Sequence, residues 1–276
     1  MIEVTVFKEN SFFKLIFEKF NFPAGEVHVR LKDMPEKIER VYFTANITSS
    51  DDIMSLLLLT NAFRSIQPNI KIDLCIPYCP YSRQDRVINR GEPNSLKMFS
   101  EIINSQNYNT VTTWDVHSPV ACSLINNLFV VQQYHWVGRV LSKYYHSQKP
   151  SNIFLVSPDM GATNKTTECS KILKIKNIIQ AHKSRNSETG KIEKTIIIDE
   201  KDFYEGHLLV VDDICDGGRT FIELGKLLEP KCYSLSLYVT HGIFSQGIEE
   251  LLKYYTVIFT ANKFDNDLSN VRLFTV

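Results

Sequence analysis

Residues 207–220 decide the fold, and they read His-Leu-Leu-Val-Val-Asp-Asp-Ile-Cys-Asp-Gly-Gly-Arg-Thr. The apolar run 208–211 is too short for a helix and does not alternate with polar residues, which is typical of a strand buried on both faces of a sheet. A helical pattern follows at 221–228 after a short turn. The segment therefore predicts a central strand of a parallel α/β sheet, followed by a turn and a helix.

Polar groups gather just after this strand, at the sheet edge where open α/β folds bind ligands. Glycines let backbone N–H groups surround an anion, and the next helix adds its positive N-terminus. Carboxylates accept hydrogen bonds from sugar hydroxyls or hold a divalent cation. The segment predicts a site for a phosphorylated sugar and a metal, and an ordinary strand-to-helix turn is the alternative. The residues concerned are Asp212, Asp213, Asp216, Gly217, Gly218, Arg219 and Thr220.

Length and charge narrow the function classes. The chain has 276 residues and is 43% hydrophobic, enough for one large or two medium α/β domains. Basic and acidic residues both number 31, so the zero net charge supports neither nucleic acid nor membrane as a partner. The first residues lack the pattern of a signal peptide, and no apolar run approaches membrane-spanning length. We expect a cytoplasmic protein.

Short apolar strands alternate with helical patterns along the chain, which predicts mainly parallel sheets flanked by helices. A polar connector at 146–151 separates two halves, so we expect domains at 1–147 and 148–276. The predicted strands are 2–7, 41–45, 71–76, 110–115, 153–156, 178–181, 195–198, 208–211, 235–240 and 257–260. The predicted helices are 51–66, 95–105, 137–145, 163–173, 221–228 and 245–253.

Two segments of the first half carry side chains suited to polyphosphates. The loop 77–93 holds arginines at 83, 86 and 90, whose guanidinium groups match phosphate oxygens. The alternative is a solvated loop in which these arginines pair with Asp85 and Glu92. His117 follows a strand end, where a histidine can bind a metal or a phosphate oxygen, although a lone histidine is more often structural.

Taken together, these segments resemble the ribose-phosphate pyrophosphokinases. The matches, in chain order, are Phe22 to Glu26, Pro-Tyr-x-x-Tyr-x-Arg-Gln-Asp-Arg at 77–86, Asp-x-His at 115–117, Ser-Pro-Asp at 157–159, the segment 212–220 and Thr-His-Gly at 240–242. The similarity runs from about Phe22 almost to the C-terminus. Several ordered motifs at compatible spacing are far more specific than any one of them.

The resemblance implies a fold of two type I phosphoribosyltransferase-like domains. It implies transfer of the β,γ-diphosphoryl group of ATP to the C1 hydroxyl of ribose 5-phosphate, with Mg2+ as cofactor and AMP as second product. ATP and a ribose 5-phosphate-type acceptor are then the partners, together with further copies of the chain, because the family suggests hexamers built from dimers.

The same resemblance assigns residues to roles. ATP binding falls to Phe22, Glu26, Arg83, Gln84, Asp85 and His117, with Phe22 and Glu26 reaching the adenine from a neighbouring subunit. Sugar-phosphate binding falls to Asp159, Asp212, Asp213, Asp216, Gly217, Gly218, Arg219 and Thr220. His117 and Asp159 serve the metal. Lys183 and Arg185, in the polar loop 181–190, align with the family's catalytic loop and are, with His117, the catalytic residues.

One departure from the family pattern opens an alternative acceptor. Arg219 stands where the family usually has glycine, and an extra guanidinium suits more negative charge than one phosphate carries. The acceptor is then ADP-ribose and the product ADP-ribose pyrophosphate, which links the chain to NAD metabolism rather than nucleotide biosynthesis. The alternative is a neutral substitution with Arg219 in solvent.

Two other functions share parts of this pattern. A non-catalytic regulatory subunit is one, but it has no need of the loop cations Lys183 and Arg185. A phosphoribosyltransferase is the other; it shares the Asp-Asp turn and does not need the segment 77–86 in a preceding half. Formation of AMP from ATP separates the kinase from both.

Overall fold

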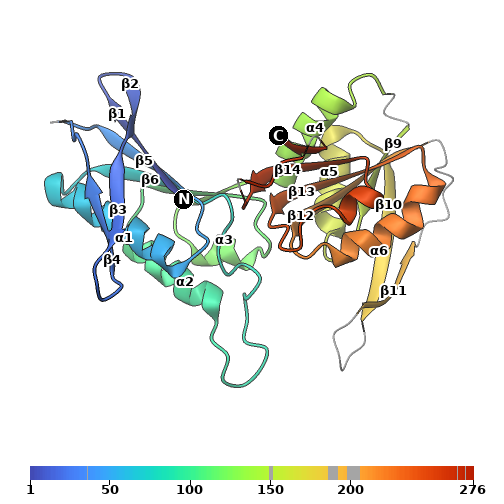
Figure 1. Cartoon of the computed structure of the whole chain (residues 1–276), viewed down its shortest axis with the longest axis horizontal. Coiled ribbons are helices and arrows are strands. Elements are labelled where there is room, and N and C mark those ends of the chain that lie inside the picture. Colours follow the sequence, from blue (N-terminus) through green and yellow to red (C-terminus); the bar gives the residue numbers. More distant parts are fainter. Residues whose placement is uncertain (36, 149–151, 186–191, 198–205, 266, 271) are drawn as a thin grey trace. The chain divides into compact units, whose positions relative to one another are not determined.

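The computed structural model describes residues 1–35, 37–148, 152–185, 192–197, 206–265, 267–270 and 272–276, and the side chains of 183–185 and 192–195 lie outside that description (Figure 1). The chain forms two compact units, Met1–Val131 and Gln132–Val276, each described here by itself. Within the described part, no helix combines the length and the apolar character needed to cross a membrane.

The first unit is built on a six-stranded sheet with the order β2-β1-β5-β6-β7-β8. Strands β5 (Arg40–Ala45), β6 (Lys71–Cys75), β7 (Thr110–Trp114) and β8 (Leu128–Val131) run parallel, while β1 (Ile2–Lys8) lies antiparallel between β2 (Ser11–Leu15) and β5. The helices are α1 (Ser50–Ile66), α2 (Ser95–Ser105) and α3 (Val120–Leu124). Alternate side chains of β5, at positions 41, 43 and 45, are buried in the core of this unit.

A separate hairpin of β3 (Phe17–Asn21) and β4 (Val27–Leu31) packs beside α1. The Ser49 hydroxyl caps α1 by accepting a hydrogen bond from the Asp52 backbone N–H at 3.2 Å, and the Lys19 ammonium lies 3.2 Å from the Asp52 carboxylate. The hairpin is thus tied to the first turn of the helix by an ion pair.

The second unit holds a seven-stranded sheet with the order β11-β10-β9-β12-β13-β14-β15. All neighbours are parallel except the edge strand β11 (Ile192–Ile197). The other strands are β9 (Ile153–Ser157), β10 (Asn177–Arg185), β12 (His207–Cys215), β13 (Ser234–Gly242), β14 (Val257–Lys263) and β15 (Leu273–Thr275). The prediction of a buried central strand is confirmed, because β12 is fourth of seven and its residues 208–211 are fully buried.

The helices of this unit are α4 (Gln133–Tyr144), α5 (Thr163–Leu173) and α6 (Arg219–Leu228), with 3-10 turns η2 (Glu229–Lys231) and η3 (Leu251–Lys253). Helix α4 packs against α5 within the second unit. The boundary expected between 147 and 148 lies beyond this helix, whereas the two compact units divide between 131 and 132.

The helix predicted at 245–253 is wrong, since only the 3-10 turn η3 forms there. Gly247 has a φ of +72°, a left-handed conformation that ends a helix, and its N–H donates to the Phe244 carbonyl at 2.8 Å in a tight turn. The buried Leu251 and Leu252 produced the helical pattern, but they lie in the short 3-10 turn η3.

Candidate functional site

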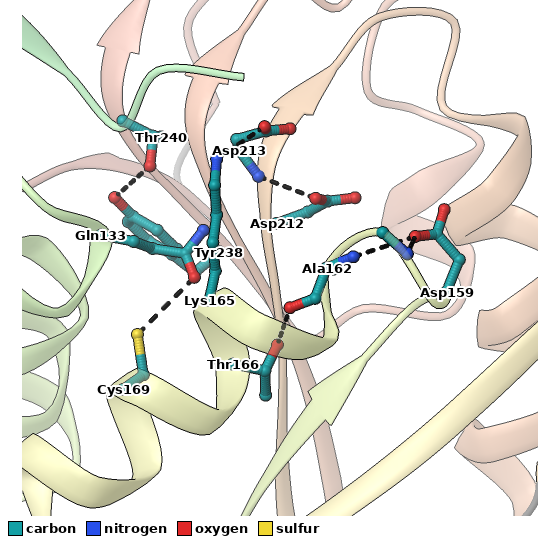
Figure 2. Close-up of polar contacts among 11 residues, drawn as sticks. Gln133, Asp159, Ala162, Lys165, Thr166, Cys169, Asp212, Asp213, Tyr238 and Thr240 are labelled. Carbon is teal, nitrogen blue, oxygen red and sulfur yellow. Dashed lines mark hydrogen bonds and ion pairs between the residues drawn. The ribbon is translucent and has the colours of Figure 1, made fainter. Parts of the chain in front are cut away.

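The carboxylates of the second unit meet because β9 and β12 are parallel neighbours, with Val156 opposite Val210. Asp159 follows β9 by two residues, and Asp212 and Asp213 lie in the last part of β12. The carboxyl ends of parallel strands share one edge of the sheet, so the three acids belong to a single constellation (Figure 2).

Asp213 forms an ion pair with Lys165, a residue that no sequence motif identified. The Lys165 ammonium lies 2.8 Å from Asp213 Oδ2, and the Asp213 backbone N–H donates to Asp212 Oδ1 at 2.9 Å (Figure 2). Asp213 is only 7% exposed. Lys165 belongs to the first turn of α5, six residues after Asp159, and only the fold brings it to β12.

Asp212 is half-buried beside the other acids. Burial raises its pKa well above the usual value, and the charges of Asp213 and Asp159 raise the pKa further, while Lys165 lowers it. The strand ends therefore hold more negative charge than the lysine balances. A bound cation, or hydroxyl groups that donate to the carboxylates, would relieve this repulsion.

Hydrogen bonds to both the side chain and the backbone of Asp159 fix the segment that carries it. Asp159 Oδ1 accepts hydrogen bonds from the N–H groups of Gly161 at 2.9 Å and Ala162 at 3.2 Å (Figure 2). The Asp159 carbonyl oxygen accepts from the Ser157 hydroxyl at 2.9 Å and from the Gln180 amide at 3.1 Å. The Asp159 carboxylate thus stands at the start of α5 in one defined position.

The predicted phosphate turn links β12 to α6. Gly218 has a φ of +74°, which favours glycine, and it precedes α6 without a side-chain cap. The first backbone N–H groups of a helix without such a cap suit an anion. Asp216 accepts a hydrogen bond from the Ser245 hydroxyl at 2.7 Å, which ties the turn to the loop after β13. Arg219 is exposed as the first residue of α6.

In the first unit, the loops after β6 and β7 lie together because these strands are parallel neighbours. The buried Ser118 hydroxyl donates to Asp85 Oδ2 at 2.6 Å, so the arginine-bearing loop is tied to the segment of His117. His117, Arg83 and Gln84 are exposed. The backbone N–H and the side-chain amide of Asn89 donate to the two oxygens of the Glu92 carboxylate, at 3.0 and 2.7 Å. These two hydrogen bonds within the loop fix the position of Glu92.

Phe22 and Glu26 stand at the tip of the β3–β4 hairpin. The Phe22 N–H donates to the Glu26 carbonyl at 2.8 Å and closes the turn. The Phe22 ring is 48% exposed and packs on Phe20 and His28, with ring centroids 5.5 and 5.3 Å apart. Both side chains are thus presented outward by a tied hairpin, as binding to a neighbouring molecule requires.

The polar loop predicted from residue 181 begins later than expected, because β10 continues through Lys183 to Arg185 and pairs with β11. The side chains of both cations, and residues 186–191, lie outside the described part. Their catalytic roles stay predictions.

The two predicted metal ligands belong to different units, His117 to the first and Asp159 to the second. No group of three or more His, Cys, Asp or Glu side chains able to hold a metal occurs among the residues described. Magnesium usually keeps several waters and binds one or two carboxylates together with substrate phosphates. The crowded acids around Asp159 and Asp212 fit such a partly hydrated cation.

Family models cover most of the chain. Residues 131–272 match the phosphoribosyl transferase domain, and residues 13–106 match the N-terminal domain of ribose phosphate pyrophosphokinase. The ribose-phosphate pyrophosphokinase of Ureaplasma parvum is 29% identical over 234 residues, covering 83% of this chain and 68% of that protein. That of Thermococcus kodakarensis is 28% identical over 256 residues, covering 91% and 87%.

Among solved structures, the phosphoribosylpyrophosphate synthetase of Mycobacterium smegmatis has the same fold, with a TM-score of 0.78 at 17% identity, covering 95% of this chain and 86% of that one. The α/β fold of two phosphoribosyltransferase-like halves expected from the sequence is confirmed. With its phosphoribosyl transferase domain, the preceding N-terminal domain and the acids at the strand ends, the chain belongs to the ribose-phosphate pyrophosphokinase family of enzymes.

Proposed function

We propose that the protein is a magnesium-dependent diphosphokinase that transfers the β,γ-diphosphoryl group of ATP to the C1 hydroxyl of ribose 5-phosphate. The products are phosphoribosyl pyrophosphate and AMP. The observation that carries the proposal is the constellation of Asp159, Asp212 and Asp213 beside the glycine turn that starts α6, in a chain of this family.

The ribose hydroxyls and the 5-phosphate of the acceptor each have a suitable binding group in the second unit. Asp212 and Asp213 would accept hydrogen bonds from the ribose hydroxyls, which relieves the repulsion between the two carboxylates. The residues from Asp216 to Thr220 would bind the 5-phosphate through backbone N–H groups at the start of α6. The sugar would then be fixed at both ends, with the C1 hydroxyl held for attack.

The first unit carries the residues that we assign to ATP binding. Arg83, Gln84 and Asp85 would bind the nucleotide from the loop tied by Ser118, and Phe22 and Glu26 of a neighbouring subunit would contact the adenine. Diphosphoryl transfer needs in-line placement and charge stabilisation more than covalent chemistry. Lys183 and Arg185 would supply positive charge for the transferred group, and His117 would complete the catalytic set.

A divalent cation fits the acids already described. Asp159 and His117 would hold Mg2+, which would neutralise charge on the transferred diphosphoryl group when it is bound. The neighbouring carboxylates of Asp159, Asp212 and Asp213 (Figure 2) support the Asp159 part of this assignment, since magnesium binds one or two carboxylates together with substrate phosphates.

A second acceptor is favoured by one residue. Arg219 is exposed at the first position of α6, beside the predicted phosphate turn. A guanidinium there suits a second phosphate, so ADP-ribose would enter with its terminal ribose in the same place and yield ADP-ribose pyrophosphate.

The test is to incubate the purified protein with ATP and Mg2+, offering ribose 5-phosphate and ADP-ribose separately, and to follow AMP and the product mass. We expect AMP with ribose 5-phosphate. AMP with ADP-ribose alone selects the second acceptor, and AMP with neither points to a regulatory subunit.

The control for this assay is the double variant Asp212→Asn/Asp213→Asn. If the strand-end acids hold the acceptor, this variant forms no AMP. AMP formation that survives in the variant would come from a contaminating kinase or would remove these acids from the site.

A further inference from the structure

We propose that Lys165 is a positioning residue for the acceptor: its ammonium fixes the Asp213 carboxylate in the orientation that receives a ribose hydroxyl. The inference rests on the proposed function and adds to the site a residue that the motif comparison does not include. It predicts that Lys165 governs recognition of the sugar hydroxyls but not of the nucleotide.

The contact differs from the ion pairs at the protein surface. The Lys165 and Asp213 side chains are 27% and 9% exposed, and Nζ lies 2.8 Å from Oδ2. The pair of Lys226 and Glu223 on α6 has a similar distance, 2.9 Å, but its side chains are 48% and 41% exposed. Exposed pairs are screened and contribute little, whereas a short, largely buried one fixes geometry.

Hydrogen bonds at the start of α5 also fix the part of the helix that carries Lys165. Its helix begins where the Asp159 carboxylate accepts the Gly161 and Ala162 N–H groups, and the Thr166 hydroxyl donates to the Ala162 carbonyl at 3.0 Å (Figure 2). The Asp159 carboxylate is therefore held directly before α5, and the Lys165 ammonium leaves from the first turn of the same helix.

A positioned carboxylate is what sugar recognition needs. An ionised carboxylate offers about four acceptor sites on two oxygens, so an ammonium on Oδ2 is compatible with a hydroxyl donor. The Asp213 N–H is also engaged, by Asp212 Oδ1. Backbone and side chain of Asp213 are thus both oriented by neighbours, and the side chain is oriented by Lys165 from α5.

The experiment measures equilibrium binding by calorimetry, which does not depend on turnover. Ribose 5-phosphate, its 2-deoxy and 3-deoxy analogues, and ATP are titrated into wild type, Lys165→Met, Lys165→Arg and the matched control Lys226→Met. We expect Lys165→Met to weaken ribose 5-phosphate binding about tenfold or more, as loss of a charge-assisted hydrogen bond would, with ATP binding within about twofold of wild type.

The deoxy analogues separate positioning from general damage. In Lys165→Met the preference for ribose 5-phosphate over at least one deoxy analogue should fall toward unity, because the hydroxyl no longer meets an oriented acceptor. Lys165→Arg should restore most of the preference, and Lys226→Met should behave as wild type.

Contrary results are distinct. An unchanged preference in Lys165→Met, or an equal loss of ATP binding, overturns the positioning role. Should Lys165→Met fail to fold, Lys165→Gln carries the same test, and loss of folding in both neutral variants makes the lysine structural and overturns the inference. Wild type that binds no ribose 5-phosphate overturns the acceptor assignment itself. Wild type that binds the sugar but forms no AMP contradicts the proposed reaction only.

Discussion

At the scale of single residues, Asp52 shows how local contacts set a titration. Burial would raise its pKa, but hydrogen bonds from the Thr48 backbone N–H at 3.1 Å and from the Lys19 ammonium at 3.2 Å lower the pKa to about 2. A carboxyl whose pKa is lowered by folding stabilises the protein above its unfolded value, and that contribution is lost as the pH falls through the folded value.

We therefore expect Asp52 to contribute about 2 kcal/mol at neutral pH that disappears between about pH 4 and pH 2. Urea unfolding of wild type and Asp52→Asn at pH 6 and near pH 2 measures this. The stability gap between the two proteins should be largest at pH 6 and should close in acid. A gap that does not change with pH would show that Asp52 acts only through its shape.

Gly218 makes a prediction about backbone conformation. At a φ of +74°, a side chain is strained, and a Cβ would also lie 3.4 Å from Leu251. Gly218→Ala should lower the free energy of unfolding by about 1–2 kcal/mol. Gly217→Ala is the control, since a Cβ there meets its nearest neighbour at 3.7 Å without a positive φ, and it should cost under about 0.5 kcal/mol. Similar thermal shifts for both would contradict the argument.

At the scale of elements, the bond from Ser118 to Asp85 couples two loops of the first unit. Ser118→Ala removes the 2.6 Å contact, so the loop 77–93 should lose its defined position. Because a hydrogen bond to a charged group contributes about 1.5–3 kcal/mol, the KM for ATP should rise about tenfold. Steady-state kinetics at saturating acceptor measures this rise.

The control is Ser123→Ala, whose hydroxyl donates within α3 to the Val120 carbonyl at 2.8 Å and lies exposed. It should leave both kinetic constants unchanged. A KM for ATP that is the same in Ser118→Ala and wild type would show that this hydrogen bond does not position the loop for ATP binding.

Helices and strands could be predicted where the sequence pattern was compatible with one structure. The fully apolar run 208–211 predicts a buried strand, and β12 is the buried centre of its sheet. Strand β2 was missed because only Leu15 of its five residues is buried, so no alternation appears. Strand β3 was missed for the same reason, since residues 17–21 are largely exposed. Strand β4 does alternate, with Val27 and Val29 buried, and this short pattern was overlooked.

At the scale of the whole molecule, the site could be predicted in part. Asp212, Asp213 and the glycine turn are contiguous in sequence, so their proximity needed no fold. Lys165 reaches Asp213 from 48 residues away, and that contact follows only from β9 and β12 being neighbours. A motif identifies site residues that are close together in the sequence. A residue that reaches the site from another helix or strand can be identified only when the order of strands in the sheet is known.

We also propose that the active assembly is a homo-oligomer built from dimers, because Phe22 and Glu26 project from an exposed hairpin. If each site uses Phe22 of a neighbour, Phe22→Ala and Asp212→Asn/Asp213→Asn should complement one another. Equal amounts, mixed after mild dissociation, should regain activity with up to about a quarter of the sites intact. Diphosphokinase assays and light scattering follow the two quantities, and no recovery despite exchange of subunits would place each site within one chain.

The start of α5 also limits how this chain can vary. Asp159 accepts the N–H groups of Gly161 and Ala162 directly before α5, and Lys165, six residues after Asp159, reaches Asp213 from the first turn of the helix. One inserted or deleted residue would turn everything beyond it by about 100° around the helix axis. Lys165 would then point away from β12. An insertion or deletion there would therefore separate the Lys165 ammonium on α5 from the Asp213 carboxylate on β12.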